Sequence, residues 1–407
     1  MSKILIVAGG GAAGFFCAVN AGRIHPGLKV ILLEKSSKLL SKVKVSGGGR
    51  CNLTHACFDR KELVNNYPRG RQFVKKAFYK FFTEDTILWF TERGVSLKTE
   101  ADGRMFPDTD SSQTVIDCLL REAKRYGVEI HLRKEMSHIE KVDDQFHLMS
   151  TDGERYSSDY LCIATGGFSK LQNLDWLKKL GHSVEEPVPS LFTFNLPDNL
   201  ITRLMGITLG KARVRIRETS LSESGPLLIT HWGFSGPVVL RLSAWGAREL
   251  AELNYQFSIA VDWVTEIEEQ RLRDHLIESR HSRTGQKITV RNEFDLPGRL
   301  WEYLVEMAGI SRDLHWQDLS NKLLNVLVQH LKGSIFEVKG KTTFKEEFVT
   351  AGGIRLSEID PQTMQSRICP GLFFAGEVMD VDGITGGFNF QHAWTSGYIA
   401  ASAIAGK

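Results

Sequence analysis

The N-terminus reads ILIVAGGGAAGFFCAVNAGRIHPGLKVILLE from Ile4 to Glu34. Two short apolar runs flank a glycine-rich turn and a stretch of small and apolar residues, a pattern typical of strand, turn, helix and strand. Gly9 allows the tight turn, Gly11 lets the backbone approach a pyrophosphate, and Gly14 lets the helix pack closely on the strand. The N-terminus of that helix offers free N–H groups and the positive end of its dipole to phosphates. The spacing therefore predicts a dinucleotide site on a βαβ unit, although a glycine-rich turn that binds nothing would share the pattern.

Glu34 closes the second apolar run, 20 residues after Gly14. A carboxylate at this place can hold a pair of ribose hydroxyls. The same charge would repel a 2′-phosphate, so FAD or NAD is favoured over NADP. The other predicted contacts of this segment are Ala12, Ala13 and Lys35.

The bulk composition describes an ordinary globular chain. Its 407 residues predict two or three domains, with 42% hydrophobic and 24% charged residues. The net charge of +3 implies no polyanionic partner by itself, so no nucleic-acid partner is expected. Six cysteines without a C-x-x-C pair or metal-ligand spacing predict a reducing compartment and no metal site. No apolar run approaches the roughly 18 residues of a membrane span and no signal peptide is evident, so a cytoplasmic protein without a membrane partner is expected.

A second glycine-rich segment, KVKVSGGGRCNLT from Lys42 to Thr54, is a poor helix and a poor strand. Such a loop can wrap backbone N–H groups around a cofactor, with Arg50 and Asn52 as polar contacts; a flexible surface loop is the alternative. Its predicted cofactor contacts are Lys42, Ser46, Gly47, Gly49, Arg50, Cys51 and Asn52.

Two later segments repeat the pattern of the N-terminus, in which an apolar strand runs into glycines. A buried strand at 160–164 runs into Thr165-Gly166-Gly167, and a strand before Gly376-Glu377 leads to a glycine turn and a helix of small residues from His392 to Ala405. The acid can take ribityl hydroxyls, and the helix N-terminus can face the flavin pyrimidine, where it favours negative charge. The predicted contacts outside the first two segments are Met136, Thr165, Gly166, Gly167, Gly376, Glu377, Asp380, Gly386, Gly387, Phe388 and Asn389.

Between these parts, near residues 185–189, the pattern changes to short alternating segments at 191–196, 207–217 and 226–230. Amphipathic patterns then predict helices at 263–280, 298–307 and 316–331, followed by a strand at 334–339. We therefore expect residues 1–189 and 341–407 to form one domain and 190–340 to be an inserted, substrate-side domain with a helical part at about 263–332. The basic stretch from Arg271 to Arg291 contains acids and lacks aromatic residues, which favours a solvated helix face over a nucleic-acid patch.

Taken together, these segments resemble the BaiN-like family of NAD(P)/FAD-dependent oxidoreductases, glutathione-reductase-like flavoproteins that include aminoacetone-oxidase-like members. The resemblance covers nearly the whole chain and rests on motifs at 9–14, 46–54, 230–237, 350–353, 374–377 and 386–389. It implies an α/β fold in which a Rossmann-like FAD-binding domain is built from both chain ends and carries an inserted β-barrel plus small helical bundle. The chain departs from the family at residues 168–173, which lack an Asp-Gly pair, and at His55, where the family has Asn.

A flavin performs the redox step while the protein supplies binding, orientation and electrostatics. We expect hydride transfer through flavin N5 to or from a small organic substrate, either enone- or steroid-like or an aminoketone. The predicted catalytic residues are Arg50, Asn52, His231 and His392, with His55 as a further candidate for proton transfer.

No second nicotinamide-binding βαβ unit is visible, so NAD(P)H is expected only as a transient donor, with the substrate itself as the alternative source of electrons. Two other functions stay open at this point. One is an FAD-dependent RNA-modifying or RNA-binding protein, and the other is a flavin-bound scaffold or sensor without turnover. The sequence leaves the oligomeric state undecided.

Overall fold

The computed structural model describes residues 2–168, 175–343 and 349–406. These residues form two compact units, one of Met1–Ser190 with Phe344–Lys407 and the other of Leu191–Thr343. Residues 169–173, where the sequence departs from the family, lie outside the described part of the chain.

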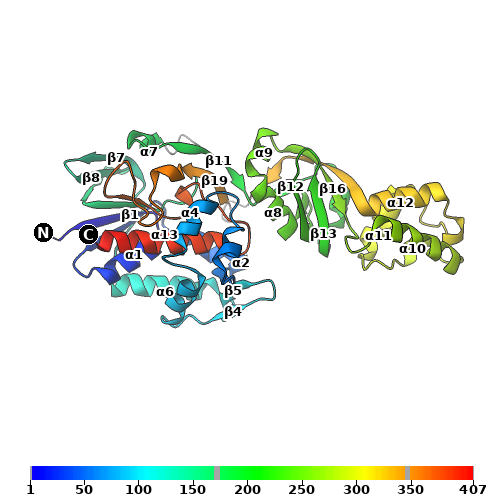
Figure 1. The fold of residues 1–407 in the computed structure, drawn as a ribbon, viewed down its shortest axis with the longest axis horizontal. Coiled ribbons are helices and arrows are strands. Elements are labelled where there is room, and N and C mark those ends of the chain that lie inside the picture. The colour runs from blue at the N-terminus through cyan, green and yellow to red at the C-terminus, as the bar shows by residue number, and fades with distance from the viewer. Residues whose placement is uncertain (1, 169–174, 344–348, 407) are drawn as a thin grey trace. The chain divides into compact units, whose positions relative to one another are not determined.

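A five-stranded parallel sheet forms the centre of the first unit (Figure 1). Its central strand β1 (Ile4–Ala8) pairs with β10 (Tyr160–Ile163) on one side and β2 (Lys29–Glu34) on the other. The outer strands are β20 (Leu372–Phe374) and β6 (Glu129–Leu132). Leu5, Ile6 and Val7 are fully buried, as expected for a parallel strand covered on both faces. The predicted Rossmann-like sheet is thereby confirmed.

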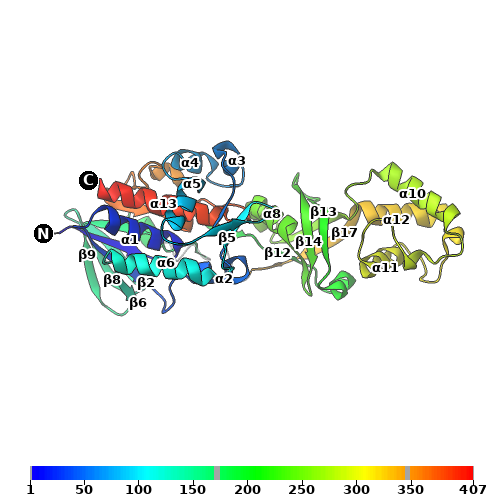
Figure 2. The same cartoon turned by 90° about the horizontal axis from the view of Figure 1, so that it is seen from below.

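Two helices from opposite ends of the sequence lie side by side in this unit, α1 (Ala12–Ile24) and α13 (Phe388–Ala405) (Figure 1, Figure 2). Their close approach depends on small residues, because a Cβ on Gly397 would lie 2.6 Å from the Ala13 carbonyl oxygen. The sequence predicts a helix over residues 111–126 capped by Ser111 or Ser112, and α6 (Ser112–Arg125) begins there, with the Ser111 side chain accepting the Gln113 N–H. The C-terminus of the chain is therefore an integral part of the N-terminal Rossmann unit.

Smaller elements complete the first unit. The helices are α2 (Ser41–Gly49), α3 (Arg60–Val64), α4 (Arg71–Ala77), α5 (Thr83–Thr91) and α7 (Asp175–Lys179). The strands are β3 (Thr54–His55), β4 (Leu97–Thr99), β5 (Arg104–Pro107), β7 (Met136–Val142), β8 (Gln145–Ser150), β9 (Arg155–Ser158), β11 (Val184–Ser190) and β19 (Val349–Ile354), and short 3₁₀ turns are η5 (Leu356–Glu358) and η6 (Gly376–Val378). Aromatic residues at helical spacing over 72–93 predict core packing of one or two helices, and Trp89 and Phe90 of α5 do lie in the core, 4.6 Å and 6.1 Å from Phe16 between ring centroids.

The second unit contains a seven-stranded antiparallel sheet in the order β17-β16-β13-β14-β15-β12-β18. The strands are β12 (Thr193–Asn195), β13 (Thr208–Ile216), β14 (Ser222–Ile229), β15 (Gly233–Ser235), β16 (Gln256–Asp262), β17 (Ser334–Lys339) and β18 (Lys341–Thr342). Only Gly340 separates β17 from β18, and this run of chain pairs with β16 at one end and with β12 at the other. The sheet therefore closes on itself as a small barrel.

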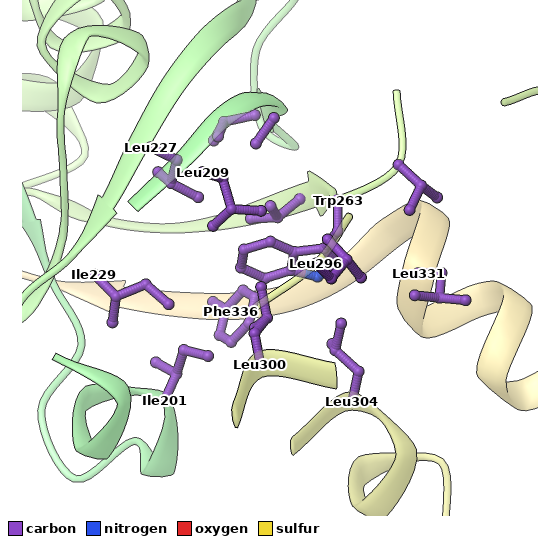
Figure 3. Close-up of a cluster of buried hydrophobic side chains, with 14 of the residues drawn as sticks. Ile201, Leu209, Leu227, Ile229, Trp263, Leu296, Leu300, Leu304, Leu331 and Phe336 are labelled. Carbon is purple, nitrogen blue, oxygen red and sulfur yellow. The ribbon is translucent and has the colours of Figure 1, made fainter. Parts of the chain in front are cut away.

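Helices pack against this barrel and extend beyond one end of it (Figure 1, Figure 2). They are η2 (Leu200–Leu204), α8 (Pro237–Trp245), α9 (Ala247–Glu252), α10 (Glu269–Ser282), η3 (Ile288–Val290), α11 (Gly298–Met307), η4 (Trp316–Asp318) and α12 (Asn321–Gly333). Figure 3 shows Trp263 and Phe336 of the barrel end meeting Leu300 and Leu304 of α11 in one apolar cluster. Barrel and helices thus share a single hydrophobic core.

Two local expectations need correction. The sequence predicts a loop at 230–237 that leads into a helix at 238–250, but the loop segment contains β15. The first helix of the helical part starts at Glu269 rather than at Trp263, because Trp263 extends from β16 and buries its side chain in the shared core. Among the described residues, no helix combines the length and the apolar character needed to cross a bilayer.

Candidate functional site

The glycine turn after β1 has the geometry that a dinucleotide requires. Gly9 has a φ of +120°, and a Cβ on Gly14 would lie 1.9 Å from the Gly9 carbonyl oxygen. Gly11 is different, since a Cβ there would meet no heavy atom within 4 Å. The turn is therefore packed on its Gly14 side and open at Gly11, the N-cap of α1, directly before Ala12 and Ala13.

Glu34 is fixed at the carboxyl end of β2 beside this turn. Its Oε2 accepts the Gly10 N–H at 2.8 Å and its Oε1 accepts the Ser36 N–H at 2.8 Å. Each carboxylate oxygen keeps a second lone pair for a ligand hydroxyl. Lys35 is exposed next to Glu34. The Lys134 N–H donates to the Glu34 carbonyl, and Met136, the first residue of β7, follows two residues later in the chain.

Three separately predicted segments meet at Glu377. Lys42 Nζ lies 2.6 Å from one of its carboxylate oxygens, and the Thr350 N–H donates to the other at 2.8 Å. Gly167 has to be glycine here, because a Cβ would lie 2.3 Å from Thr350 Oγ1 and 2.6 Å from Glu377 Oε1. Lys42, Gly167 and Glu377 thus form one polar cluster.

Four other predicted contacts, Thr165, Gly166, Gly376 and Asp380, belong to the chain segments that adjoin this cluster. Gly166 has a φ of +77° and would place a Cβ 3.9 Å from Glu377 Oε2, and Thr165 is exposed beside it. Gly376 lies against Ala13 of α1, and the Asp380 N–H donates to the Ile354 carbonyl.

The N-terminus of α13 is joined to the Lys42–Thr54 segment. In the amide orientation that satisfies both groups, Asn52 accepts the Gly387 N–H at 3.0 Å and donates to the Thr54 carbonyl at 3.1 Å. A Cβ on Gly387, which has a φ of +94°, would lie 2.5 Å from the Thr54 carbonyl. Asn52 therefore positions the helix end that the sequence assigns to the flavin ring.

The glycines of that segment turn the chain sharply. Gly47 and Gly49 have φ values of +58° and +85°, and the Cys51 N–H donates to the Ser46 carbonyl at 2.9 Å. Helix α2 accordingly loses helical geometry at Ser46. The Cys51 side chain is fully buried and its burial raises its pKa to about 12, so this thiol is no redox nucleophile at neutral pH.

Two predicted polar contacts are engaged within the protein. Arg50 pairs with Glu100 at 2.6 Å and its guanidinium lies 4.0 Å from the Phe106 ring centroid. Asn389 closes its own loop, accepting the Gly383 N–H and donating to the Gly383 carbonyl, both at 2.8 Å. Both side chains brace glycine-rich loops, and a role on the flavin ring stays a prediction for each.

The candidate histidines occupy different surroundings. His55 contacts the Gly386 carbonyl at 3.0 Å through Nδ1 and stacks on Phe388 at 4.7 Å, and burial lowers its pKa. His392 is buried in α13, and burial lowers its pKa to about 4, which the nearby Gly376 backbone only partly offsets. His231 is exposed in the second unit, with its ring 4.2 Å from that of Trp232.

Orphaned polar atoms provide a test of whether this site fits FAD. Both ring nitrogens of His392 and the Oγ1 of Thr350 are buried without a hydrogen-bond partner among the described residues. Unsatisfied buried polar groups are rare in native proteins, and ligand oxygens would satisfy these. With the open turn at Gly11 and two helix N-termini, the residues fit a dinucleotide. Among the described residues, no group of His, Cys, Asp and Glu is arranged as a metal site.

Thr350 was missed as a site residue, although the sequence carries a signal for it. It lies in β19 directly before Ala351-Gly352-Gly353, so a threonine precedes a glycine pair here much as Thr165 precedes Gly166-Gly167.

Comparison with known proteins identifies the family. A sequence profile described as HI0933-like protein Rossmann domain matches residues 3–403. The chain belongs to the HI0933-like family. It is accordingly an FAD-dependent oxidoreductase, and the resemblance drawn from its motifs is confirmed.

Two relatives match over nearly their whole length. A ribosomal RNA dihydrouridine synthase of Escherichia coli K12 is 31% identical over 97% of this chain and 96% of its own. A 3-dehydro-bile acid delta(4,6)-reductase of Clostridium scindens is 28% identical over 100% of this chain and 99% of its own. The solved 3-ketosteroid-delta4-(5alpha)-dehydrogenase of Rhodococcus jostii RHA1 has a TM-score of 0.51 at 14% identity, covering 98% of this chain and 96% of its own, and shares the fold.

Proposed function

We propose that this HI0933-like protein is a reductase that adds hydrogen across a carbon–carbon double bond conjugated with a carbonyl group. The observation that carries the proposal is the full-length similarity to two relatives with different substrates. The delta-4 double bond of a 3-dehydro bile acid and the C5–C6 double bond of uracil share one property. In each, a conjugated carbonyl polarises the double bond and prepares one carbon for hydride.

FAD supplies the hydride when it is bound. The turn at Gly11 and the carboxylate of Glu34 would hold the dinucleotide end of FAD, and the Glu377 cluster would hold its ribityl hydroxyls. Asn52 fixes the N-terminus of α13, which would face the flavin pyrimidine and favour negative charge there through the helix dipole. The thiol of Cys51 takes no part.

The reaction also needs one proton on the carbon next to the carbonyl group. His392, one of the predicted catalytic residues, is the less favourable donor, because burial lowers its pKa to about 4. Its buried, unpartnered ring nitrogens would be available to hydrogen-bond a bound cofactor. His231 and His55 stay the candidates for proton donation.

The electron donor and the direction of the reaction are tested together. The purified holoprotein is mixed anaerobically with NADH or NADPH, and the flavin absorbance is followed. Bleaching by a reduced pyridine nucleotide, followed by recovery when a steroid-like enone or a uridine oligomer is added, is the expected result. Bleaching by an aminoketone, with recovery only on admission of oxygen, would instead establish an amine oxidase.

A uracil in RNA is a second candidate substrate beside a small enone. It is favoured by the 31% identity to a ribosomal RNA dihydrouridine synthase. The expectation of no nucleic-acid partner came from a net charge of +3, which is an average over the chain and does not describe a local surface. Incubation with ribosomal RNA and measurement of dihydrouridine by mass spectrometry decides between the two substrates.

A further inference from the structure

An unusual row of cations runs along one strand of the second unit. Four successive outward positions of β13 and its C-terminal extension carry Lys211, Arg213, Arg215 and Arg217, and all four are exposed. The intervening residues Ala212, Val214 and Ile216 are fully buried. Because alternate residues share a face, the four cations lie about 7 Å apart in a line on the barrel surface.

These cations are weakly neutralised by their surroundings. Lys211 pairs with Glu266, and Arg213 donates to Ser224 Oγ at 3.3 Å. Among the described residues, no carboxylate lies within ion-pair distance of Arg213, Arg215 or Arg217.

The neighbouring strands keep the row accessible. Ser222 and Ala260 lie directly opposite Arg215 on β14 and β16. Next to Arg213, Asp262 is already held by Lys332 at 2.7 Å. Glu337 accepts from Ser258, and Glu218 accepts the Ser258 N–H. Small neutral side chains therefore border Arg215, and Asp262 beside Arg213 is neutralised by Lys332. Glu218 and Glu337 are held by Ser258 and keep their charge near the Arg217 end of the row, so the row has a net positive charge that is strongest around Arg213 and Arg215.

We propose that this row, Lys211–Arg213–Arg215–Arg217, is a docking surface for the sugar–phosphate backbone of an RNA strand. Its linear spacing is comparable with that of successive phosphates on an extended strand, and the serine hydroxyls beside it can donate to phosphate oxygens. Guanidinium groups suit phosphate because they donate paired hydrogen bonds. The inference rests on the RNA substrate of the proposed function and assigns the binding of that RNA to the barrel.

The test compares two triple variants of the holoprotein. Arg213→Gln/Arg215→Gln/Arg217→Gln removes three charges from the row, and Arg271→Gln/Arg291→Gln/Arg312→Gln removes three from the helical part. Binding of a fluorescent uridine 20-mer is measured from low to moderate salt. Loss of three phosphate contacts should lower the slope of log K against log salt by about 2 and weaken binding roughly tenfold or more. The second variant should retain the wild-type slope, and the arginine-to-lysine version of the first should recover most of it.

Three outcomes would overturn the proposal. They are an unchanged slope in the first variant, an equal loss in both variants, and binding of the wild type to phosphatidylglycerol vesicles but not to the oligomer. Flavin reoxidation by a small enone is measured on the same proteins and should be equal in all of them. If no conjugated substrate reoxidises the flavin while the slopes behave as expected, the proposed function fails and the RNA surface stands.

Discussion

Replacing glycine by alanine at Gly11 or at Gly14 adds the same methyl group to one turn at two positions with different surroundings. A Cβ at Gly14 would lie 1.9 Å from the Gly9 carbonyl oxygen, and real Cβ contacts below 3.0 Å essentially do not occur. Gly14→Ala therefore forces α1 away from the turn by about 1 Å. Because the clash is with a backbone atom at 1.9 Å, it lies in the upper part of the usual overpacking range, about 2–3 kcal/mol, and the better helix propensity of alanine offsets about 1 kcal/mol. We expect a net loss of about 1–2 kcal/mol, or an apparent Tm lower by roughly 2–8 °C.

Gly11→Ala is the matched control because its methyl group enters open space at a φ of −90°. Its stability should stay within about 0.5 kcal/mol of the wild type. Its FAD affinity should still fall by at least roughly tenfold, or about 1.4 kcal/mol, because the methyl group occupies the side that a pyrophosphate approaches.

Thermal unfolding of the flavin-free proteins and titration with FAD by fluorescence separate the two effects. Wild-type stability in Gly14→Ala would refute the packing argument. Wild-type FAD affinity in Gly11→Ala would refute the placement of the pyrophosphate.

Other predictions concern the histidine, the thiols and the second core. In flavin-free protein, the folded pKa of His392 is about 4 against 6.5 when unfolded. The unfolded state thus takes up the extra proton first, so stability should fall by up to about 3 kcal/mol as the pH drops from 6.5 to 4. Denaturant curves across this range should show a smaller fall in His392→Phe, and an equal fall would contradict the assignment. Iodoacetamide at pH 8 should label the half-buried Cys57 well before Cys51, as peptide mapping can show; early labelling of Cys51 would mean that its burial is wrong. Trp263→Ala should destabilise the second unit by about 3–5 kcal/mol, because that ring is buried in the shared core. Hydrogen exchange should then accelerate in the barrel and in the helices together, whereas acceleration in the barrel alone would show separate cores.

Local patterns were sufficient to predict the Rossmann part of the fold. The run before Gly9 and the turn after it lie within a few residues of each other, so periodicity and glycine spacing determine strand, turn and helix without tertiary information. The same holds for α6, whose cap Ser111 is adjacent to its first turn. For these elements local propensity and tertiary packing favour the same structure.

The predictions from sequence were less accurate for elements whose bounds depend on tertiary packing. Trp263 fits the helical pattern of the segment after it. Its backbone N–H, however, donates to the Leu331 carbonyl, and its ring is buried in the core of the second unit. Strand β14 begins at Ser222, four residues before the apolar alternation that predicts it, because its polar start pairs with β13. Helix 238–250 is split at Gly246 into α8 and α9.

The separate segments of the candidate site were predictable, but their mutual contacts were not. Lys42 and Glu377 form an ion pair across 335 residues of sequence, which no local pattern contains. The engagement of Arg50 by Glu100 likewise depends on the β4–β5 hairpin. The cation row of β13 was missed because buried residues separate its lysine and arginines in the sequence. The four side chains lie in one row because alternate residues of a β-strand point to the same face.

The central claim is that reduced flavin in this protein passes hydride to a double bond conjugated with a carbonyl group. The most direct measurement is to reduce the purified holoprotein photochemically without oxygen and to add the conjugated substrate in a stopped-flow spectrophotometer. The account predicts that the oxidised flavin band returns and that the product carries two additional hydrogen atoms on the former double bond. A flavin that stays reduced with enones and with uridine-containing RNA, and that reoxidises only when oxygen enters, would contradict it.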